Sequence, residues 1–301
     1  MRVRRSLQAA LALVSTAGAA EAQRRPRTPI EQPQSQAWPA RRAWTDQEEQ
    51  AFGEFVTAIG RGVAAHRCRG LAQCLDNPSV NPLHVPGRRM RFEADCADVA
   101  YLLRAYYAWR RELPFAYVSG IRWQRRPEEG RRALDTRPVG LSRWDAFQSP
   151  WQLLHELGGR VNSNWFRMRP EVEDGDWYPV RVARGAIRPG TAYYDPDGHV
   201  LVVYEVTPQG DVLLFDGHPG GSITARRMDA TLTPGSFRLG GGFMNYRRPV
   251  LRDGAIHRPR NRELADYDGH AQYDRARRTV AGRTVNFDTW VRASLGGVAV
   301  R

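Results

Sequence analysis

Residues 199–216 read HVLVVYEVTPQGDVLLFD. A nearly continuous run of β-branched and aliphatic residues is followed by Thr-Pro-Gln-Gly and then by a second apolar run. Proline at the second position and glycine at the fourth are typical of a type I turn. The stretch therefore predicts an antiparallel hairpin, and together with the helical patterns elsewhere in the chain it favours an α+β fold.

The register of this hairpin decides which side chains share a face of the sheet. If Val206 pairs with Asp211 across the turn, Asp216 lies opposite Leu201. Leu201 and His199 are two residues apart, so they point to the same face. We therefore expect His199 and Asp216 to be diagonal neighbours within hydrogen-bonding distance. One β-bulge in the hairpin would place His199 and Asp216 on opposite faces of the sheet.

Cys96 supplies a thiol at the start of a predicted helix. Asp95 is placed as its N-cap, and apolar residues recur with helical spacing at Val99, Leu102, Leu103, Tyr106 and Trp109. The first turn of a helix favours a thiolate, whereas the nearby anions Asp95 and Asp98 disfavour it. The alternative is that Cys96 is a small buried apolar residue, which is a common environment for a free cysteine.

Cys96, His199 and Asp216 occur in the order of a thiol triad: nucleophile, base and orienting group. The candidate catalytic residues are therefore these three. In the expected register His218 lies directly opposite His199, and it is the alternative orienting group. The backbone N–H of Cys96 is a candidate oxyanion donor.

Several segments resemble the transglutaminase-like core of the papain-like superfamily. They are Asp95-Cys96, residues 102–105 and 113–120, the His199 strand and the Asp216 strand, and together they cover roughly residues 90–220. The NlpC/P60 cell-wall peptidases are more distantly similar. The resemblance implies a papain-like core with the nucleophile helix packed on an antiparallel sheet. It also implies a cysteine hydrolase or acyltransferase of the peptidase, amidase or transglutaminase-like kind.

The N-terminal region indicates export. Residues 1–22 have the basic start, short apolar core and Ala-Glu-Ala cleavage site of a secretory signal peptide, which predicts a periplasmic or secreted protein. Residues 23–43 are rich in Pro, Gln and Arg and are predicted to be a disordered leader. Residues 44–301 are expected to form a single papain-like domain with a C-terminal helical tail. In an oxidising compartment Cys68 and Cys74 are expected to pair, leaving Cys96 as the free thiol.

The elements expected around the hairpin follow from apolar periodicity and turn residues. They are a helix after the Thr45–Glu48 capping box, strands near 115–123, 178–182, 191–194 and 222–227, helices at 150–157 and 287–295, and an Arg-rich excursion at 125–137.

The formal charge of the chain is +13, and all of its basic residues except histidine are arginine. The absence of lysine excludes Schiff-base, Ser-Lys and Walker A chemistry. The arginines are spread over the whole chain, so we expect no nucleic-acid partner. No apolar run is long enough for a transmembrane segment.

We expect neither a cofactor nor a metal. Asp195–Gly198 fits a tight turn better than a metal loop, because further ligands at the required spacing are missing. His155-Glu156 lacks the second histidine of a zinc helix, and the three cysteines lack a partner pair. Gly240–Gly242 is not flanked by the strand and helix of a nucleotide loop.

Two hypotheses follow. In the first, a secreted thiol enzyme cleaves or transfers an amide or peptide acyl group through Cys96, His199 and Asp216, with a peptide of the cell envelope as its substrate. In the second, an inactive papain-like scaffold binds peptide or glycan in the envelope through its Trp and Tyr residues. The sequence does not decide whether the enzyme would be a hydrolase or a transferase. It also leaves open the second oxyanion donor and the oligomeric state.

Overall fold

The computed structural model describes residues 37–125, 134–234 and 237–296. The residue contacts separate residues 1–34 from residues 35–301, and every described residue belongs to the second unit. The expected signal peptide and residues 23–36 of the expected leader lie outside the described residues.

The described residues form a mixed α+β fold in which every sheet is antiparallel. The α-helices are α1 (Asp46–Ala64), α2 (Leu71–Asp76), α3 (Cys96–Arg110), α4 (Pro150–Arg160) and α5 (Phe287–Gly296). The main sheet has the strand order β3-β8-β4-β5-β6-β7. Its strands are β3 (Trp177–Pro179), β4 (Ala192–Tyr194), β5 (Val200–Val206), β6 (Val212–Gly217), β7 (Ile223–Arg227) and β8 (Gly242–Tyr246).

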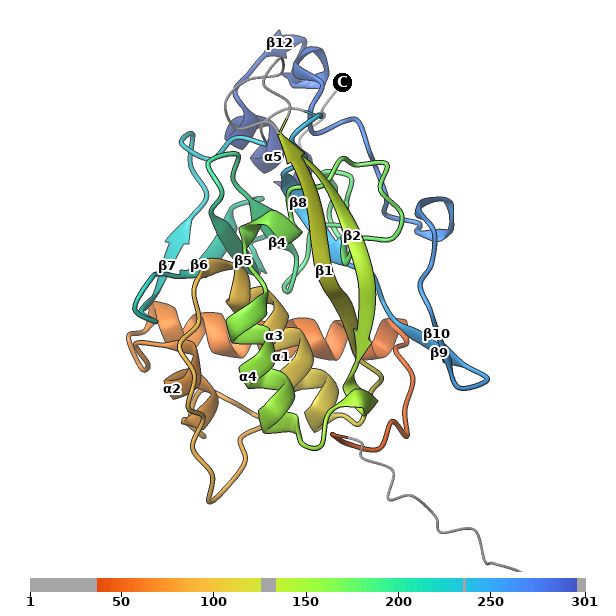
Figure 1. Ribbon diagram of the computed structural model, residues 1–301. Coiled ribbons are helices and arrows are strands. Elements are labelled where there is room, and N and C mark those ends of the chain that lie inside the picture. Colours follow the sequence, from red (N-terminus) through yellow and green to blue (C-terminus); the bar gives the residue numbers. More distant parts are fainter. Residues whose placement is uncertain (1–36, 126–133, 235–236, 297–301) are drawn as a thin grey trace, which may run out of the picture. The chain divides into compact units, whose positions relative to one another are not determined.

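Three two-stranded sheets accompany the main sheet (Figure 1). They pair β1 (Ala116–Arg125) with β2 (Leu134–Arg143), β9 (Val250–Arg252) with β10 (Ala255–His257), and β11 (Thr279–Val280) with β12 (Arg283–Thr284). The interpretation of residues 125–137 as an excursion is corrected at both ends, because Arg125 is the last residue of β1 and Leu134 begins β2. Residues 126–133 lie outside the described part of the chain.

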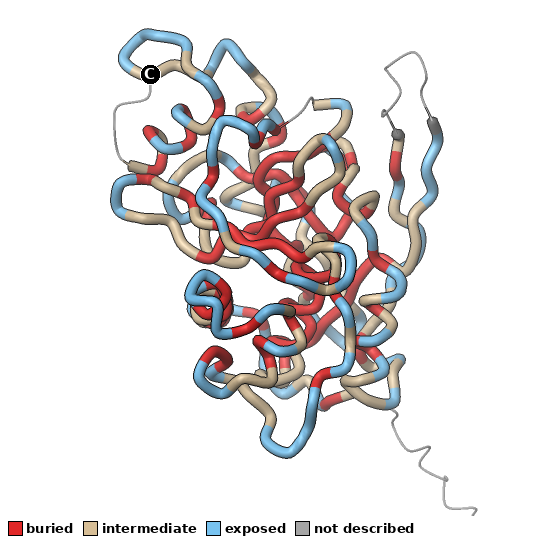
Figure 2. Tube along the Cα trace, turned by 90° about the vertical axis from the view of Figure 1, so that its left-hand side faces the viewer, coloured by how far each residue is buried: buried red, intermediate tan, exposed pale blue. Residues whose placement is uncertain are grey.

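Strand β5 is buried on both faces, which explains its continuous apolar sequence. Val200 and Val202 belong to the core on the side of α1 and α3. Leu201 and Val203 belong to a second core, to which α5 contributes Phe287, Trp290, Val291 and Leu295. Figure 2 shows the buried segments gathered in the middle of the described chain, with exposed segments around them. The hairpin therefore holds its residues in the centre of the fold.

In the β5–β6 hairpin His199 and Asp216 share a face of the sheet as expected, but only because two deviations from the expected register cancel. Val206 pairs with Val212 rather than with Asp211, which is one residue away from the expected register. A bulge between Val203 and Glu205 then restores the expected pairing, and Val202 faces Phe215. Extending this register brings Asp216 opposite Leu201, as predicted.

Helix α1 stabilises the bulge. The hydroxyl of Thr57 donates a hydrogen bond of 2.7 Å to the carbonyl oxygen of Tyr204, the residue at the bulge. A Cβ at Gly60 would lie 2.2 Å from the Tyr204 ring, so only glycine lets α1 approach this closely. Thr45 caps α1 as expected and accepts a hydrogen bond from the Glu48 N–H.

The folded part begins earlier than predicted. Trp38 is only 4% exposed, its indole donates to the Leu113 carbonyl at 2.8 Å, and its own carbonyl accepts from Trp144 at 2.9 Å. Burial of this indole outweighs the Pro- and Arg-rich composition around it. Residues 37–43, which the composition assigned to a disordered leader, are therefore part of the fold.

The Cys68–Cys74 disulfide is present and encloses the start of α2. Strand β8 is the main element that the periodicity did not indicate, although it lies inside the sheet between β3 and β4. No helix among the described residues combines the length and apolar character that crossing a bilayer requires.

Candidate active site

Cys96 is the first residue of α3, and a capping box holds it there. The Asp95 carboxylate accepts hydrogen bonds from the N–H groups of Ala97 and Asp98, and the Asp98 carboxyl accepts from the Asp95 N–H. Cys96 is half-buried and is the free thiol of the described residues. The two acids that flank it in sequence thus form the cap that fixes its position.

Gly217 allows the start of α3 to lie against the end of β6. A Cβ at this position would lie 2.7 Å from the carbonyl oxygen of Asp95 and 2.8 Å from that of Ala94. Both distances are shorter than real Cβ contacts, and both atoms belong to the backbone. The missing side chain of Gly217 therefore sets how closely Cys96 approaches the sheet.

His199 lies at the entrance to β5, after the tight turn that the sequence indicates. The N–H of Asp195 donates to the His199 carbonyl at 2.8 Å, and the N–H of Gly198 donates to Asp195 at 2.9 Å. Gly198 has a φ of 103°, a left-handed value that glycine adopts without strain. The Asp195 side chain accepts from the Asp197 N–H, so this segment is a turn that delivers the histidine to the sheet.

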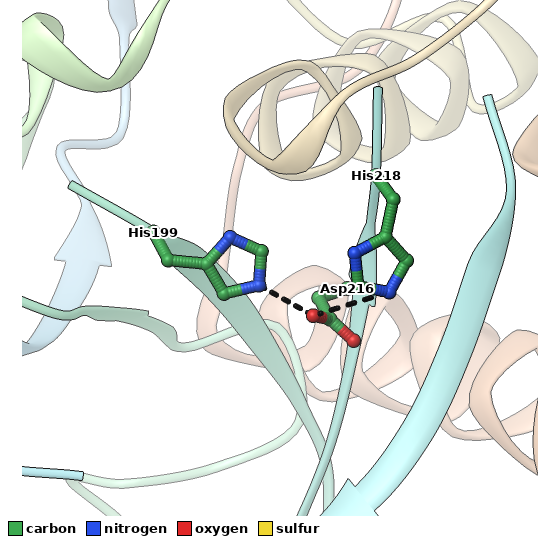
Figure 3. A group of neighbouring side chains, drawn as sticks. All are labelled: His199, Asp216 and His218. Carbon is green, nitrogen blue, oxygen red and sulfur yellow. Dashed lines mark hydrogen bonds and ion pairs between the residues drawn. The ribbon is translucent and has the colours of Figure 1, made fainter. Parts of the chain in front are cut away.

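The imidazole of His199 connects the other two candidate residues. Its Nε2 donates to Asp216 Oδ2 at 2.5 Å, and the Cys96 thiol lies close enough to the ring to contribute to the raised pKa of His199. Because Nε2 is engaged by Asp216, Nδ1 is the nitrogen that remains for Cys96. Figure 3 shows the ring of His199 turned toward the carboxylate on the neighbouring strand. The structure thus brings the three predicted residues together.

Asp216 is held from two sides. It is 3% exposed, and its second oxygen, Oδ1, accepts a hydrogen bond of 2.9 Å from the Thr224 hydroxyl. Burial alone would raise the pKa of this carboxyl, but the hydrogen bonds from His199 and Thr224 and the charge of His199 lower it overall. Asp216 is therefore an anion of fixed orientation.

His218 occupies a secondary position beside this carboxylate. Its Nε2 lies 3.6 Å from Asp216 Oδ2 and donates to the Thr224 hydroxyl at 2.8 Å. The rings of His199 and His218 are nearly parallel, with centroids 5.8 Å apart. Of the two alternatives for orienting His199, the geometry favours Asp216.

The electrostatics of the site favour a charged imidazole. The hydrogen bonds of His199 to Asp216 and to Cys96 raise its pKa to about 10, although burial opposes the shift. The site therefore places a positively charged group beside the Cys96 sulfur.

Asp98 carries less negative charge near neutral pH than its sequence identity suggests. Burial is the main cause that raises the pKa of the Asp98 carboxyl to about 7, and the charge of Asp95 adds to it. The hydrogen bond from the Asp95 backbone acts in the opposite direction and lowers this pKa. Near neutral pH about half of the molecules therefore carry a neutral carboxyl at this position.

Two other features that could serve a functional site do not include the triad residues. His155 is exposed on α4. A cavity of about 960 Å³ is lined by α1 and by residues of the 178–189 and 248–266 segments, and none of the three candidate residues lines it.

Two residues of the site were missed by the sequence reasoning. Thr224 lies opposite Asp216 in the β6–β7 register, so a register for that second pair of strands would have indicated it. Gly217 follows Asp216 directly, and only the packing of α3 reveals its role.

No family model, curated protein or solved structure matches this chain. The site is therefore interpreted from its own geometry.

Proposed function

We propose that this chain is a thiol enzyme that cleaves or transfers an amide or peptide acyl group through Cys96, His199 and Asp216. The observation that carries the proposal is the position of His199, which is hydrogen-bonded to the buried Asp216 carboxylate and lies close enough to the Cys96 thiol for the thiol to raise its pKa. A nucleophile, a base and an orienting group are the three parts that acyl transfer by a thiol requires.

In the proposed reaction the Cys96 sulfur attacks the carbonyl carbon, and a carbon–sulfur bond forms. His199, which is charged near neutral pH, already holds the proton that comes from the Cys96 thiol, and it delivers this proton to the departing amine as the carbon–nitrogen bond breaks. Asp216 holds the imidazole in the required tautomer and stabilises its positive charge. The thioester is then attacked by water or by a second amine. Attack by water makes the protein a hydrolase, and attack by an amine makes it an acyltransferase.

The oxyanion of the intermediate needs N–H donors. The Asp95 side chain caps the N–H groups of Ala97 and Asp98 but not that of Cys96. In our proposal the Cys96 N–H therefore points to the position where the oxyanion develops.

The arrangement supports membership of the papain-like superfamily with a transglutaminase-like core. A nucleophile helix packs on an antiparallel sheet, and the base and the orienting residue come from two neighbouring strands, β5 and β6. The signal-like N-terminus and the disulfide support a periplasmic or secreted location, and this location favours a cell-envelope peptide as substrate.

The binding alternative has support of its own. Trp123 is 55% exposed on β1, and Val139 and Leu141 are exposed on the paired strand β2. The β1–β2 register places Trp123 on one face of this two-stranded sheet and Val139 and Leu141 on the other, so each face offers a small exposed apolar contact. A catalytically inactive scaffold would bind a peptide or glycan through such contacts without needing a reactive thiol.

Reactivity of Cys96 separates the two proposals. We expect one rapid alkylation at Cys96 during brief exposure to dilute iodoacetamide near neutral pH, measured by intact mass. His199→Ala should abolish the rapid phase, while His155→Ala, an exposed histidine on α4, should leave it unchanged. A Cys96 that reacts only after unfolding would refute the enzyme and leave the binder.

A further inference from the structure

Three side chains beside Cys96 present ligand atoms to a common point. One ligand atom from each of His199, Asp216 and His218 lies within 4.8 Å of the other two. In Figure 3 the two imidazole rings, from the start of β5 and from just beyond β6, both face the Asp216 carboxylate. Each histidine side chain is 37% exposed, so a cation can reach this point from solvent.

The triad does not need His218. Asp216 already orients His199 at 2.5 Å, whereas His218 lies 3.6 Å from the same carboxylate oxygen. The Thr224 hydroxyl accepts a hydrogen bond of 2.8 Å from His218 Nε2, and the ring of His218 stays nearly parallel to that of His199. The thiol mechanism gives His218 no step of its own, and in a metal site its Nε2 would exchange the Thr224 hydrogen bond for the cation.

Two imidazole nitrogens and one carboxylate oxygen are ligands that zinc prefers, and three protein ligands leave its fourth position open. Ligands about 2.0–2.1 Å from a tetrahedral zinc are about 3.3 Å apart. The two present separations, 2.5 and 3.6 Å, lie on either side of that value. The third separation, between the ligand nitrogens of the two histidines, is at most 4.8 Å, so changes of up to about 1.5 Å in the separations would suffice.

The surroundings suit a carboxylate ligand as well. Thr224 donates to Asp216 Oδ1 and leaves Oδ2 as the oxygen that faces both histidines. Hydrogen bonds of this kind orient metal-ligating carboxylates.

We propose that His199, Asp216 and His218 bind one Zn²⁺ ion, and that its binding blocks the thiol chemistry. Coordination uses the lone pair of each Nε2, so the protons on these nitrogens pass to solvent or to Nδ1. When zinc is bound, His199 no longer exchanges a proton with Cys96. It also loses its hydrogen bond to Asp216, because the carboxylate coordinates the same ion. This inhibitory part rests on the proposed function, whereas the metal site stands without it.

The binding test is titration of the full chain, with its disulfide intact, with zinc chloride followed by calorimetry. We expect one zinc per chain, an affinity at least about tenfold weaker in His218→Asn, and no change in His155→Asn. The same titration of Cys96→Ser should retain binding, which excludes a site made by the thiol alone. Absence of stoichiometric binding, or equal affinity in His218→Asn with an unchanged melting temperature, would overturn the site.

The inhibition test is the rate of Cys96 alkylation with and without zinc. Zinc should slow alkylation of the wild-type protein, EDTA should restore it, and His218→Asn should be much less sensitive to zinc. Zinc that binds through His218 without slowing alkylation would overturn the inhibitory part. If Cys96 shows no His199-dependent reactivity while zinc still binds, the proposed function fails and the metal site remains.

Discussion

Substitution of Gly217 by alanine tests whether the close approach of α3 to β6 creates the site. The new Cβ would lie 2.7 Å from the Asp95 carbonyl oxygen, and an ordinary contact needs about 3.4 Å. The start of α3 must therefore retreat by about 0.7 Å. Cys96 is carried by this turn, so its distance from His199 should increase.

A misplacement of about 1 Å can reduce the rate of a positioned reaction by roughly 100-fold. We expect Gly217→Ala to slow alkylation of Cys96 by roughly tenfold or more and to lower the free energy of unfolding by roughly 1–3 kcal/mol. Intact-mass kinetics and urea denaturation measure the two effects.

Gly220→Ala is the matched control for this substitution. Gly220 lies in the same β6–β7 turn and has a φ of 85°, but no atom lies within 4 Å of its virtual Cβ. Its replacement should cost roughly 1–2 kcal/mol in backbone strain without displacing α3. The reasoning is refuted if folded Gly217→Ala reacts at the wild-type rate, or if Gly220→Ala slows Cys96 equally.

Three further predictions concern the surroundings of the thiol. The folded-state pKa of Asp98 is raised from 3.8 to about 7, so stability should fall as pH rises through this window. Asp98→Asn should therefore be more stable than wild type at pH 8, by on the order of 2–4 kcal/mol, and nearly equal to it at pH 4; a pH-independent difference in urea denaturation would contradict this. Thr224→Val should slow Cys96 alkylation several-fold by releasing Asp216, whereas Thr224→Ser should restore it; equal rates in both variants would argue against the hydrogen bond. Removal of the disulfide by Cys68→Ala and Cys74→Ala should cost about 2 kcal/mol in unfolding free energy; an unchanged denaturation midpoint would contradict that estimate.

The central hairpin could be predicted because its side-chain period is two and its turn residues are specific. The face shared by His199 and Asp216 nevertheless depends on two compensating deviations, the turn register and the bulge at Tyr204. A register based on an ideal turn cannot anticipate either of them. Thr57 and Gly60 of α1 stabilise the bulge from more than 140 residues away in sequence.

Tertiary contacts decide the features that local patterns missed. Composition indicated disorder around Trp38, but its indole finds a buried carbonyl at Leu113, 75 residues along the chain. The strand Gly242–Tyr246 follows a run of glycines with positive φ, and its short sequence gives little periodic signal. The cap at Asp95, by contrast, is a local motif and was predicted together with the helix that carries Cys96.

A double-mutant cycle on Cys96 reactivity tests the central claim most directly. The rate of iodoacetamide alkylation is measured by intact mass for wild type, His199→Gln, Asp216→Asn and the double variant at one pH. If Asp216 acts through His199, each single substitution slows Cys96 strongly, and the double variant is no slower than His199→Gln alone. Independent effects that multiply in the double variant, or rates that stay at the wild-type value, would contradict the triad.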